Sequence, residues 1–271
     1  MPAVVPIEKY RQTGTIGFKY AFGDVGIYPK IFHQHHEVFL LLNGCVEYIG
    51  ENDRSFIQPN TLVLIPQGIY HQFIVHGNIS EYERCVLEID LSYQPTAHFE
   101  SLLKQQTLFQ LTADSGILDS FIRLCKYIEE PYANDFPYLA EAITTEILSQ
   151  LRHEQLLPSE NKGTLNPLSR KAMEYIHAHL DQPLSLDKLA EACFVTPSTL
   201  SHAFRNSYGI SVMQYVQNKK MAIAKHYILK GYSPGEVCRM CGYIEYSTFY
   251  RAYMKEYGFS PTQDEQNRDK R

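Results

Sequence analysis

The chain has 271 residues, of which 44% are hydrophobic and 20% are charged, so it is long enough for about two domains and apolar enough to bury a core in each. Its formal net charge of −5 argues against a protein that coats nucleic acid with its whole surface. Because the longest wholly apolar run, Val38 to Leu42, is short and no secretory signal opens the chain, we expect a cytoplasmic protein without a membrane span and with reduced cysteines.

Charge is unevenly distributed along the chain. Residues 167–271 contain 14 Lys and Arg against 10 Asp and Glu, whereas residues 1–166 contain 11 against 20. Such a change of sign is typical of a nucleic-acid-binding part joined to another kind of domain. The C-terminal part is therefore the candidate for phosphate contacts.

Short strands separated by turn residues are predicted from about residue 18 to residue 90. Val38–Leu42 is followed by Asn43-Gly44, a dipeptide typical of a β-hairpin. Further strands are expected at 46–49, 55–57, 61–65, 73–75 and 85–89. Many short strands at near-regular spacing favour a β-sandwich or a β-barrel.

After Pro95 the hydrophobic period changes from two to about 3.6 residues, which predicts helices. One apolar stripe contains Leu118, Phe121, Ile122, Cys125 and Ile128, and a second contains Leu139, Ile143, Ile147 and Leu151. These stripes either complete the core of the strand domain or pair with a second subunit. Our working prediction places a dimer interface on them.

A polar segment separates these helices from the rest of the chain. Residues 158–166 carry Gly163 and are bracketed by prolines, which is typical of a linker. We therefore expect an N-terminal domain at 1–157 and a C-terminal domain at 167–271.

The C-terminal part contains an internal repeat. Residues 198–211 align with residues 247–260, and six of the fourteen positions are identical. Each copy predicts a short helix, a tight turn and a second helix. The expected capping residues of this half of the chain are Ser185, Thr196, Ser211, Ser233 and Ser260. Ala190 and Cys238 are the small residues expected where the two helices of each copy cross.

The outward face of each second helix is the surface that could enter a major groove of DNA. The candidate base contacts are Ser198, Ser201, His202 and Arg205 in the first copy and Tyr246, Ser247, Tyr250 and Arg251 in the second. Lys219 and Lys255 are candidate phosphate contacts. The alternative is a helical bundle with two similar hairpins that binds no nucleic acid.

Five short motifs distinguish this half of the chain. They are Lys220-Met-Ala-Ile-Ala-Lys, Ser233-Pro-Gly-Glu-Val, Cys241-Gly-Tyr, Ser247-Thr-Phe-Tyr-Arg-Ala-Tyr and Tyr257-Gly-Phe-Ser-Pro. Together they resemble the signature of AraC/XylS-type transcription regulators, over residues 167–262. The resemblance implies two helix-turn-helix motifs joined by a long helix at about 212–230. Two positions depart from the pattern: Phe194 stands where a turn glycine is common, and Gln263-Asp264 replaces Tyr-Arg.

Three histidines and a glutamate are predicted to converge in the N-terminal part. His33, His35 and Glu37 share one face of an extended segment, and Pro66-x-Gly68-x-x-His71 brings a further histidine from a later strand. Such a set can bind a divalent metal or a polar ligand. The pattern is similar to that of cupins, although the first cupin histidine falls at Ile31 and the asparagine of the second motif at Val75.

These observations predict a two-domain α+β protein with a cupin-like N-terminal β-barrel, dimerisation helices and an all-α C-terminal domain with two helix-turn-helix motifs. The barrel is expected to bind an effector, a sugar or a related neutral polar metabolite, and its candidate ligand residues are His33, His35, Glu37, Tyr48 and His71. No catalytic residue, metal or cofactor is expected. The expected partners are promoter DNA, the effector, a second copy of the chain and RNA polymerase, but no membrane. The alternative is a metal-dependent cupin enzyme with a fused DNA-binding domain, and the choice between activator and repressor stays open.

Overall fold

The computed structural model describes residues 6–24, 33, 35–51, 54–90, 93–104, 107–153, 162–163 and 166–268. The chain divides into two compact units, one formed by Met1–Gly50 and Arg54–Gly163 and the other by Glu51–Asp53 and Thr164–Arg271. Most of the expected linker, and Ile31, lie outside the described residues. Among the described helices, none has the length and apolar character needed to cross a membrane.

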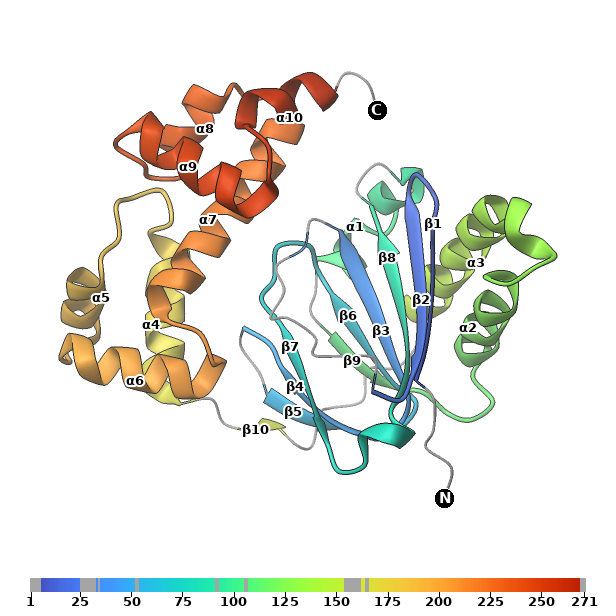
Figure 1. The fold of residues 1–271 in the computed structure, drawn as a ribbon. Helices are drawn as coiled ribbons and strands as arrows, with labels where there is room; N and C mark the ends of the chain where they lie inside the picture. The colour runs from blue at the N-terminus through green and yellow to red at the C-terminus, as the bar shows by residue number, and fades with distance from the viewer. Residues whose placement is uncertain are drawn as a thin grey trace. The chain divides into compact units, whose positions relative to one another are not determined.

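The N-terminal unit is built on two antiparallel sheets (Figure 1). Its strands are β1 (Ile7–Gln12), β2 (Ile16–Phe22), β3 (His36–Asn43), β4 (Cys45–Ile49), β5 (Arg54–Ile57), β6 (Thr61–Ile65), β7 (Gln72–His76), β8 (Glu83–Ile89), β9 (Thr107–Gln110) and β10 (Lys162–Gly163). The larger sheet has the order β1-β2-β8-β3-β6-β9, and the smaller has the order β10-β5-β4-β7. The α+β class is confirmed, but the expected closed barrel is wrong, because the strands form two separate sheets.

The chain changes sheet at Asn43-Gly44, where the sequence predicted a hairpin. β3 pairs with β6 and β8, whereas β4 pairs with β5 and β7. Because β3 already has a neighbour on each edge, β4 cannot pair with it. Gly44 adopts a φ of 105°, a conformation that favours glycine, as the chain bends into the second sheet.

Both faces of the larger sheet are buried at its central strands β3 and β6. Val38 and Leu40 on β3 pack in a core that also contains residues of helices α2 (Gly116–Tyr127) and α3 (Phe136–Leu151). Phe39 and Leu41 point to the opposite face and pack with side chains of the smaller sheet. Because β3 is buried on both faces, its sequence is a continuous apolar run. Each of its fully buried side chains contributes about 1.5–3 kcal/mol to the stability of the folded state.

The two predicted helical stripes belong to this core. Phe121 of α2 and Ile143 and Ile147 of α3 are buried against the larger sheet. The dimer interface predicted on these residues is therefore wrong, and the core alternative is correct for them. Ile122 is the exception on the first stripe, because it is 61% exposed.

Short helical elements complete the N-terminal unit. They are α1 (Glu100–Leu103) and the 3₁₀ segments Ile79–Glu81, Gln94–Ala97 and Tyr132–Asn134.

The C-terminal unit is helical in the part that the structure describes. It contains α4 (Pro167–Ala178), α5 (Leu186–Cys193), α6 (Pro197–Tyr208), α7 (Val212–Leu229), α8 (Pro234–Met240), α9 (Tyr246–Tyr257) and α10 (Pro261–Arg268). The predicted helix starts are confirmed, because Ser185, Thr196, Ser211 and Ser233 each accept a hydrogen bond from a backbone N–H of the first turn.

Two helix-turn-helix units follow from these helices. The first is formed by α5 and α6, the second by α8 and α9, and α7 joins them (Figure 1). Ala190 and Cys238 are buried at the predicted crossing positions. Phe204 of α6 and Phe249 of α9 are fully buried on the inner faces of the second helices. The inner face of each repeat is thereby confirmed as core.

Candidate functional sites

The second helix of the first repeat presents a short polar face. Ser198, His202 and Arg205 of α6 are exposed, and Ser201 is half-buried. This surface can approach a nucleic acid because no long apolar side chain stands between these positions. The four residues that the sequence predicted therefore share one accessible face.

The corresponding helix of the second repeat carries larger side chains. Tyr246, Ser247, Tyr250 and Arg251 of α9 are all exposed. Arg251 Nε donates a hydrogen bond to the Ser247 carbonyl at 3.3 Å. This bond uses one of five guanidinium N–H donors, so the side chain keeps the capacity for a bidentate contact with a base.

The two candidate phosphate contacts lie in different environments. Lys255 is exposed on α9. Lys219 is only 9% exposed, and its ammonium lies 2.7 Å from the Glu51 carboxylate of the same compact unit. Lys255 is thus the better placed of the two to reach a phosphate.

One further exposed residue was not predicted from the sequence. Ile244 stands two residues before α9 and is 81% exposed. An apolar side chain at the start of a groove-reading helix can contact a thymine methyl group. In the sequence, Ile244 is only a single apolar residue in a turn. Single apolar residues are common on protein surfaces, so the sequence alone does not indicate a DNA contact at this position.

The turn positions of the two repeats share a left-handed backbone. Phe194 follows α5 with φ 62°, and Gly242 follows α8 with φ 67°. The Phe194 ring projects into solvent and is 87% exposed. At Gly242 a Cβ would lie 2.6 Å from backbone atoms of Gln182, so glycine is required there. The departure at Phe194 is tolerated because its side chain extends into solvent.

The second departure from the family pattern has a structural role. Asp264 of α10 is buried and accepts hydrogen bonds from Lys225 and Tyr253. Burial and the charge of Asp264 raise the pKa of the Tyr253 hydroxyl, which keeps it protonated as a donor. These bonds fasten α10 to α7 and α9.

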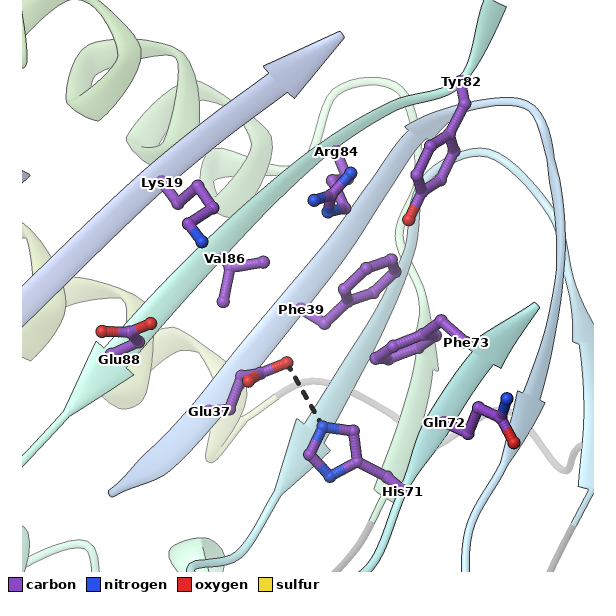
Figure 2. Close-up of a pocket in the computed structure, with 10 residues that line it drawn as sticks. All are labelled: Lys19, Glu37, Phe39, His71, Gln72, Phe73, Tyr82, Arg84, Val86 and Glu88. Carbon is purple, nitrogen blue, oxygen red and sulfur yellow. Dashed lines mark ion pairs between the residues drawn. The ribbon is translucent and has the colours of Figure 1, made fainter. Parts of the chain in front are cut away.

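A pocket lined by both aromatic and charged side chains lies within the N-terminal unit. Its lining residues are Lys19, Glu37, Phe39, His71, Gln72, Phe73, Tyr82, Arg84, Val86 and Glu88 (Figure 2). They come mainly from neighbouring strands β2, β8 and β3 of the larger sheet and from β7 of the smaller one. The volume of about 80 Å³ is several times the space that one water molecule needs.

The predicted histidines gather around Glu37. His33 Nε2 lies 3.0 Å from Glu37 Oε2, and His71 Nε2 lies 3.8 Å from Glu37 Oε1 (Figure 2 shows the second pair). The rings of His33 and His35 stack with centroids 4.2 Å apart. The structure thus brings together four of the five ligand residues that the sequence predicted.

The protonation states around Glu37 follow from these contacts. Burial raises the pKa of Glu37, but the His33 contact and the neighbouring histidines outweigh it and hold this pKa at about 2. Burial lowers the pKa of His33, and Glu37 more than reverses this effect, so the pKa is raised. Both nitrogens of His33 face acceptors, because Nδ1 lies 2.7 Å from the His35 carbonyl. We infer an imidazolium–carboxylate pair at His33 and Glu37.

The fifth predicted ligand residue, Tyr48, lies in the core. Its side chain is fully buried, and its ring centroid is 5.2 Å from that of Phe73, which lines the pocket. Tyr48 therefore supports the pocket wall without lining it.

A metal ion could use part of this set. One ligand atom each from His33, His35 and Glu37 lies within 4.8 Å of the others. Burial and the neighbouring His33 lower the pKa of His35 to about 3, so His35 is neutral, the form that binds metals. His33, however, must lose a proton and its contact with Glu37 before it can become a ligand.

Sequence reasoning missed the charged residues of β8. Arg84, Val86 and Glu88 alternate with Cys85, Leu87 and Ile89, which pack in the helix-side core. The sequence did contain a signal for them, because charged residues stand in a strand whose other residues are apolar. Charges are rarely buried without a partner or a function.

Comparisons with known proteins agree with the C-terminal geometry. The sequence pattern of a helix-turn-helix domain family matches residues 189–267. The probable transcriptional regulator LumQ of Photobacterium leiognathi is 28% identical over 86% of this chain and 91% of its own length. The arabinose operon regulatory protein of Salmonella typhimurium is 27% identical over 79% of this chain and 78% of its own length.

Solved structures also show similarity to the chain. The C-terminal domain of AraT, a response regulator from Geobacillus stearothermophilus, is 30% identical over 39% of this chain and 88% of that one, with a TM-score of 0.38. ToxT of Vibrio cholerae is 11% identical over 96% of both chains, with a TM-score of 0.39.

The paired helix-turn-helix units and their exposed polar faces define a DNA-binding transcriptional regulator. The chain belongs to the AraC family of these regulators.

Proposed function

We propose that this regulator is controlled by a small polar effector that binds in the N-terminal pocket. The observation that carries the proposal is the pocket itself, which Glu37 and His71 line in the unit that lacks the helix-turn-helix motifs. Allosteric control requires that the effector bind two states of the protein with different affinity. If the pocket changes shape between two states, the buried charged groups hold the effector with a different affinity in each state.

The sequence favoured a sugar or a related neutral polar metabolite as effector. A carboxylate such as Glu37 accepts hydrogen bonds from hydroxyl groups, and an imidazole such as His71 can donate or accept. The arabinose operon regulatory protein among the relatives supports this class by its name. Lys19 and Arg84 add positive charge to the same pocket.

We also propose that the chain acts as a homodimer on promoter DNA and contacts RNA polymerase there. Ile122 on α2 and Tyr138 on α3 support a dimer, because these large apolar side chains are 61% and 78% exposed. Exposed apolar residues on neighbouring helices are typical of an interaction surface.

The test begins with selection of tight-binding duplexes from a random library by the full chain. Affinity for the selected duplex is then measured with and without an extract of small polar metabolites. We expect the extract to change the affinity of the wild type. Glu37→Gln and His71→Gln should abolish that change and keep basal DNA binding.

The matched control is His153→Gln, because His153 is exposed and does not line the pocket. It should respond as the wild type does. An unchanged response in Glu37→Gln and His71→Gln would refute the assignment of the pocket, and failure to select any duplex would refute DNA binding.

A further inference from the structure

The pocket carries charges of both signs, and the strand register separates them. Arg84 and Glu88 lie on the pocket face of β8 and pair with Leu41 and Glu37 of β3 respectively. Four residues of a strand span roughly 13 Å. The Arg84 and Glu88 side chains therefore start from opposite ends of the pocket.

Arg84 forms the cationic end, and Lys19 lies between the two ends. Arg84 is 2% exposed, and its guanidinium carbon lies 5.0 Å from the centre of the Tyr82 ring. Burial lowers the pKa of Arg84 to about 9, so the side chain stays cationic at neutral pH. Lys19 enters from β2, where it pairs with Val86 of β8. In Figure 2 the Arg84 guanidinium, the Lys19 ammonium and the Tyr82 hydroxyl lie in the upper part of the view.

The opposite end contains Glu37, Glu88 and His71, which lie in the lower part of Figure 2. Tyr10 donates a hydrogen bond to Glu88 at 2.9 Å. Phe39 and Phe73 stack with ring centroids 3.9 Å apart and form an apolar wall of the pocket. The lining thus combines a cationic end, an end rich in acceptors and an aromatic wall.

Resting on the proposed function, we propose that the effector is a small hydroxy acid, with its carboxylate at Arg84 and Lys19 and its hydroxyl groups at Glu37 and His71. A guanidinium binds a carboxylate through two parallel N–H bonds, which a neutral hydroxyl group cannot reproduce. Hydroxyl groups can donate to Glu37 and also accept from a protonated nitrogen. A phosphate dianion fits less well, because Glu37 and Glu88 face the same small space. The proposal replaces the neutral effector that the sequence favoured.

The test uses matched pairs of ligands that differ only in one carboxylate. Calorimetric titration of the full chain compares glycerate with glycerol, gluconate with glucitol, and glucuronate with glucose. Butyrate serves as a carboxylate without hydroxyl groups. We expect at least one hydroxy acid to bind about tenfold or more tightly than its neutral counterpart and than butyrate, because a charge-assisted bidentate contact is worth about one order of magnitude or more.

Variants then assign the two ends. Lys19→Met and Arg84→Lys should weaken hydroxy-acid binding about tenfold or more; Arg84→Lys keeps the charge and loses only the bidentate geometry. Arg84→Lys is preferred to an apolar substitution because Arg84 is buried. Lys9→Met is the control, because Lys9 pairs with Glu129 and does not line the pocket. It should bind as the wild type does.

The outcomes separate this proposal from the proposed function. Equal or tighter binding of the neutral partners, or no heat from any of these ligands, would overturn the hydroxy-acid assignment. If a neutral sugar binds and changes DNA affinity, effector control stands and the ligand class is wrong. If a hydroxy acid binds with the expected variant pattern but never changes DNA affinity, the ligand class stands and effector control fails.

Discussion

At the scale of single residues, the same left-handed turn position is occupied by Phe194 in one repeat and by Gly242 in the other. A side chain in this conformation costs about 1–2 kcal/mol, which glycine avoids. Both Phe194→Gly and Phe194→Ala remove the ring that contacts Lys171, but only alanine keeps the Cβ that is strained in this conformation. We therefore expect the Phe194→Gly variant to be about 1 kcal/mol more stable than the Phe194→Ala variant. Urea denaturation followed by helical circular dichroism measures the difference. Equal stability of the two variants would contradict the strain argument.

Gly242→Ala should have the opposite effect. The added Cβ would lie 2.6 Å from backbone atoms of Gln182, which cannot move aside as a flexible side chain could. We expect a loss of about 2–4 kcal/mol from strain and overpacking together. The same urea titration measures it, and Gly235→Ala is the control, because a Cβ at Gly235 meets nothing within 4 Å.

The His33–Glu37 pair makes stability depend on pH. The pKa of His33 is raised in the folded state, so its stabilisation is complete below the unfolded value of about 6.5 and is lost as the pH rises through the raised pKa. The depressed pKa of Glu37 is about 2, so Glu37 stays ionised throughout neutral and alkaline pH. We expect His33→Gln to lower the melting temperature more at pH 6 than at pH 9. His35 and His36 are present in both proteins, so their own titration largely cancels in the comparison. An equal difference at both pH values would contradict the imidazolium assignment.

At the scale of elements, α9 carries two kinds of candidate DNA contact. A bidentate arginine–guanine contact is worth about 1–3 kcal/mol of base discrimination. Arg251→Ala should therefore weaken binding to a selected duplex by that amount and leave a scrambled duplex nearly unaffected. Lys255→Ala should weaken both duplexes alike and reduce the salt slope by about one. Fluorescence anisotropy measures the affinity of each variant for the two duplexes. If Arg251→Ala loses the same affinity for both duplexes, Arg251 contacts the DNA backbone and not a base.

The helices α2 and α3 illustrate how packing decides between core and interface. Ile147 is fully buried, so Ile147→Asp places an unpaired charge in the core and should unfold the N-terminal unit. Ser149→Asp is the matched control, because Ser149 is exposed on the same helix, and its stability should change by no more than about 0.5 kcal/mol. Thermal unfolding followed by circular dichroism tests both. A folded Ile147→Asp variant would make this stripe a candidate interface again.

At the scale of the whole molecule, DNA binding is expected to reside in the C-terminal unit, where the positive charge and both repeats lie. Residues 164–271 alone should bind the selected duplex, and their affinity should fall as the salt concentration rises, because this unit makes the phosphate contacts. The fragment should not respond to any effector. Mobility shift at several salt concentrations measures this, after circular dichroism has established that the fragment is folded. A folded fragment that shifts no duplex at low salt would contradict the assignment.

The local pattern of the sequence determined most of the C-terminal unit. Capping residues such as Ser185 and Ser233 and the repeat at 198–211 and 247–260 located the helices and their inner faces, because helix starts and amphipathic periods depend on residues close together in the chain. The convergence of His33, Glu37 and His71 was also predicted, but strand alternation does not account for it, because β3 begins at His36 and His33 lies before it.

Only the tertiary structure decided the rest. The hairpin at Asn43-Gly44 and the dimer stripe at Ile143 failed because pairing partners and the fate of an apolar face are set by segments distant in the sequence. The positive charges of the pocket could not be read from the sequence either, because Lys19 and Arg84 line one pocket only through the β2–β8 pairing. The sequence thus determined the local elements and the regulator family, whereas long-range strand pairing determined which charges line the pocket.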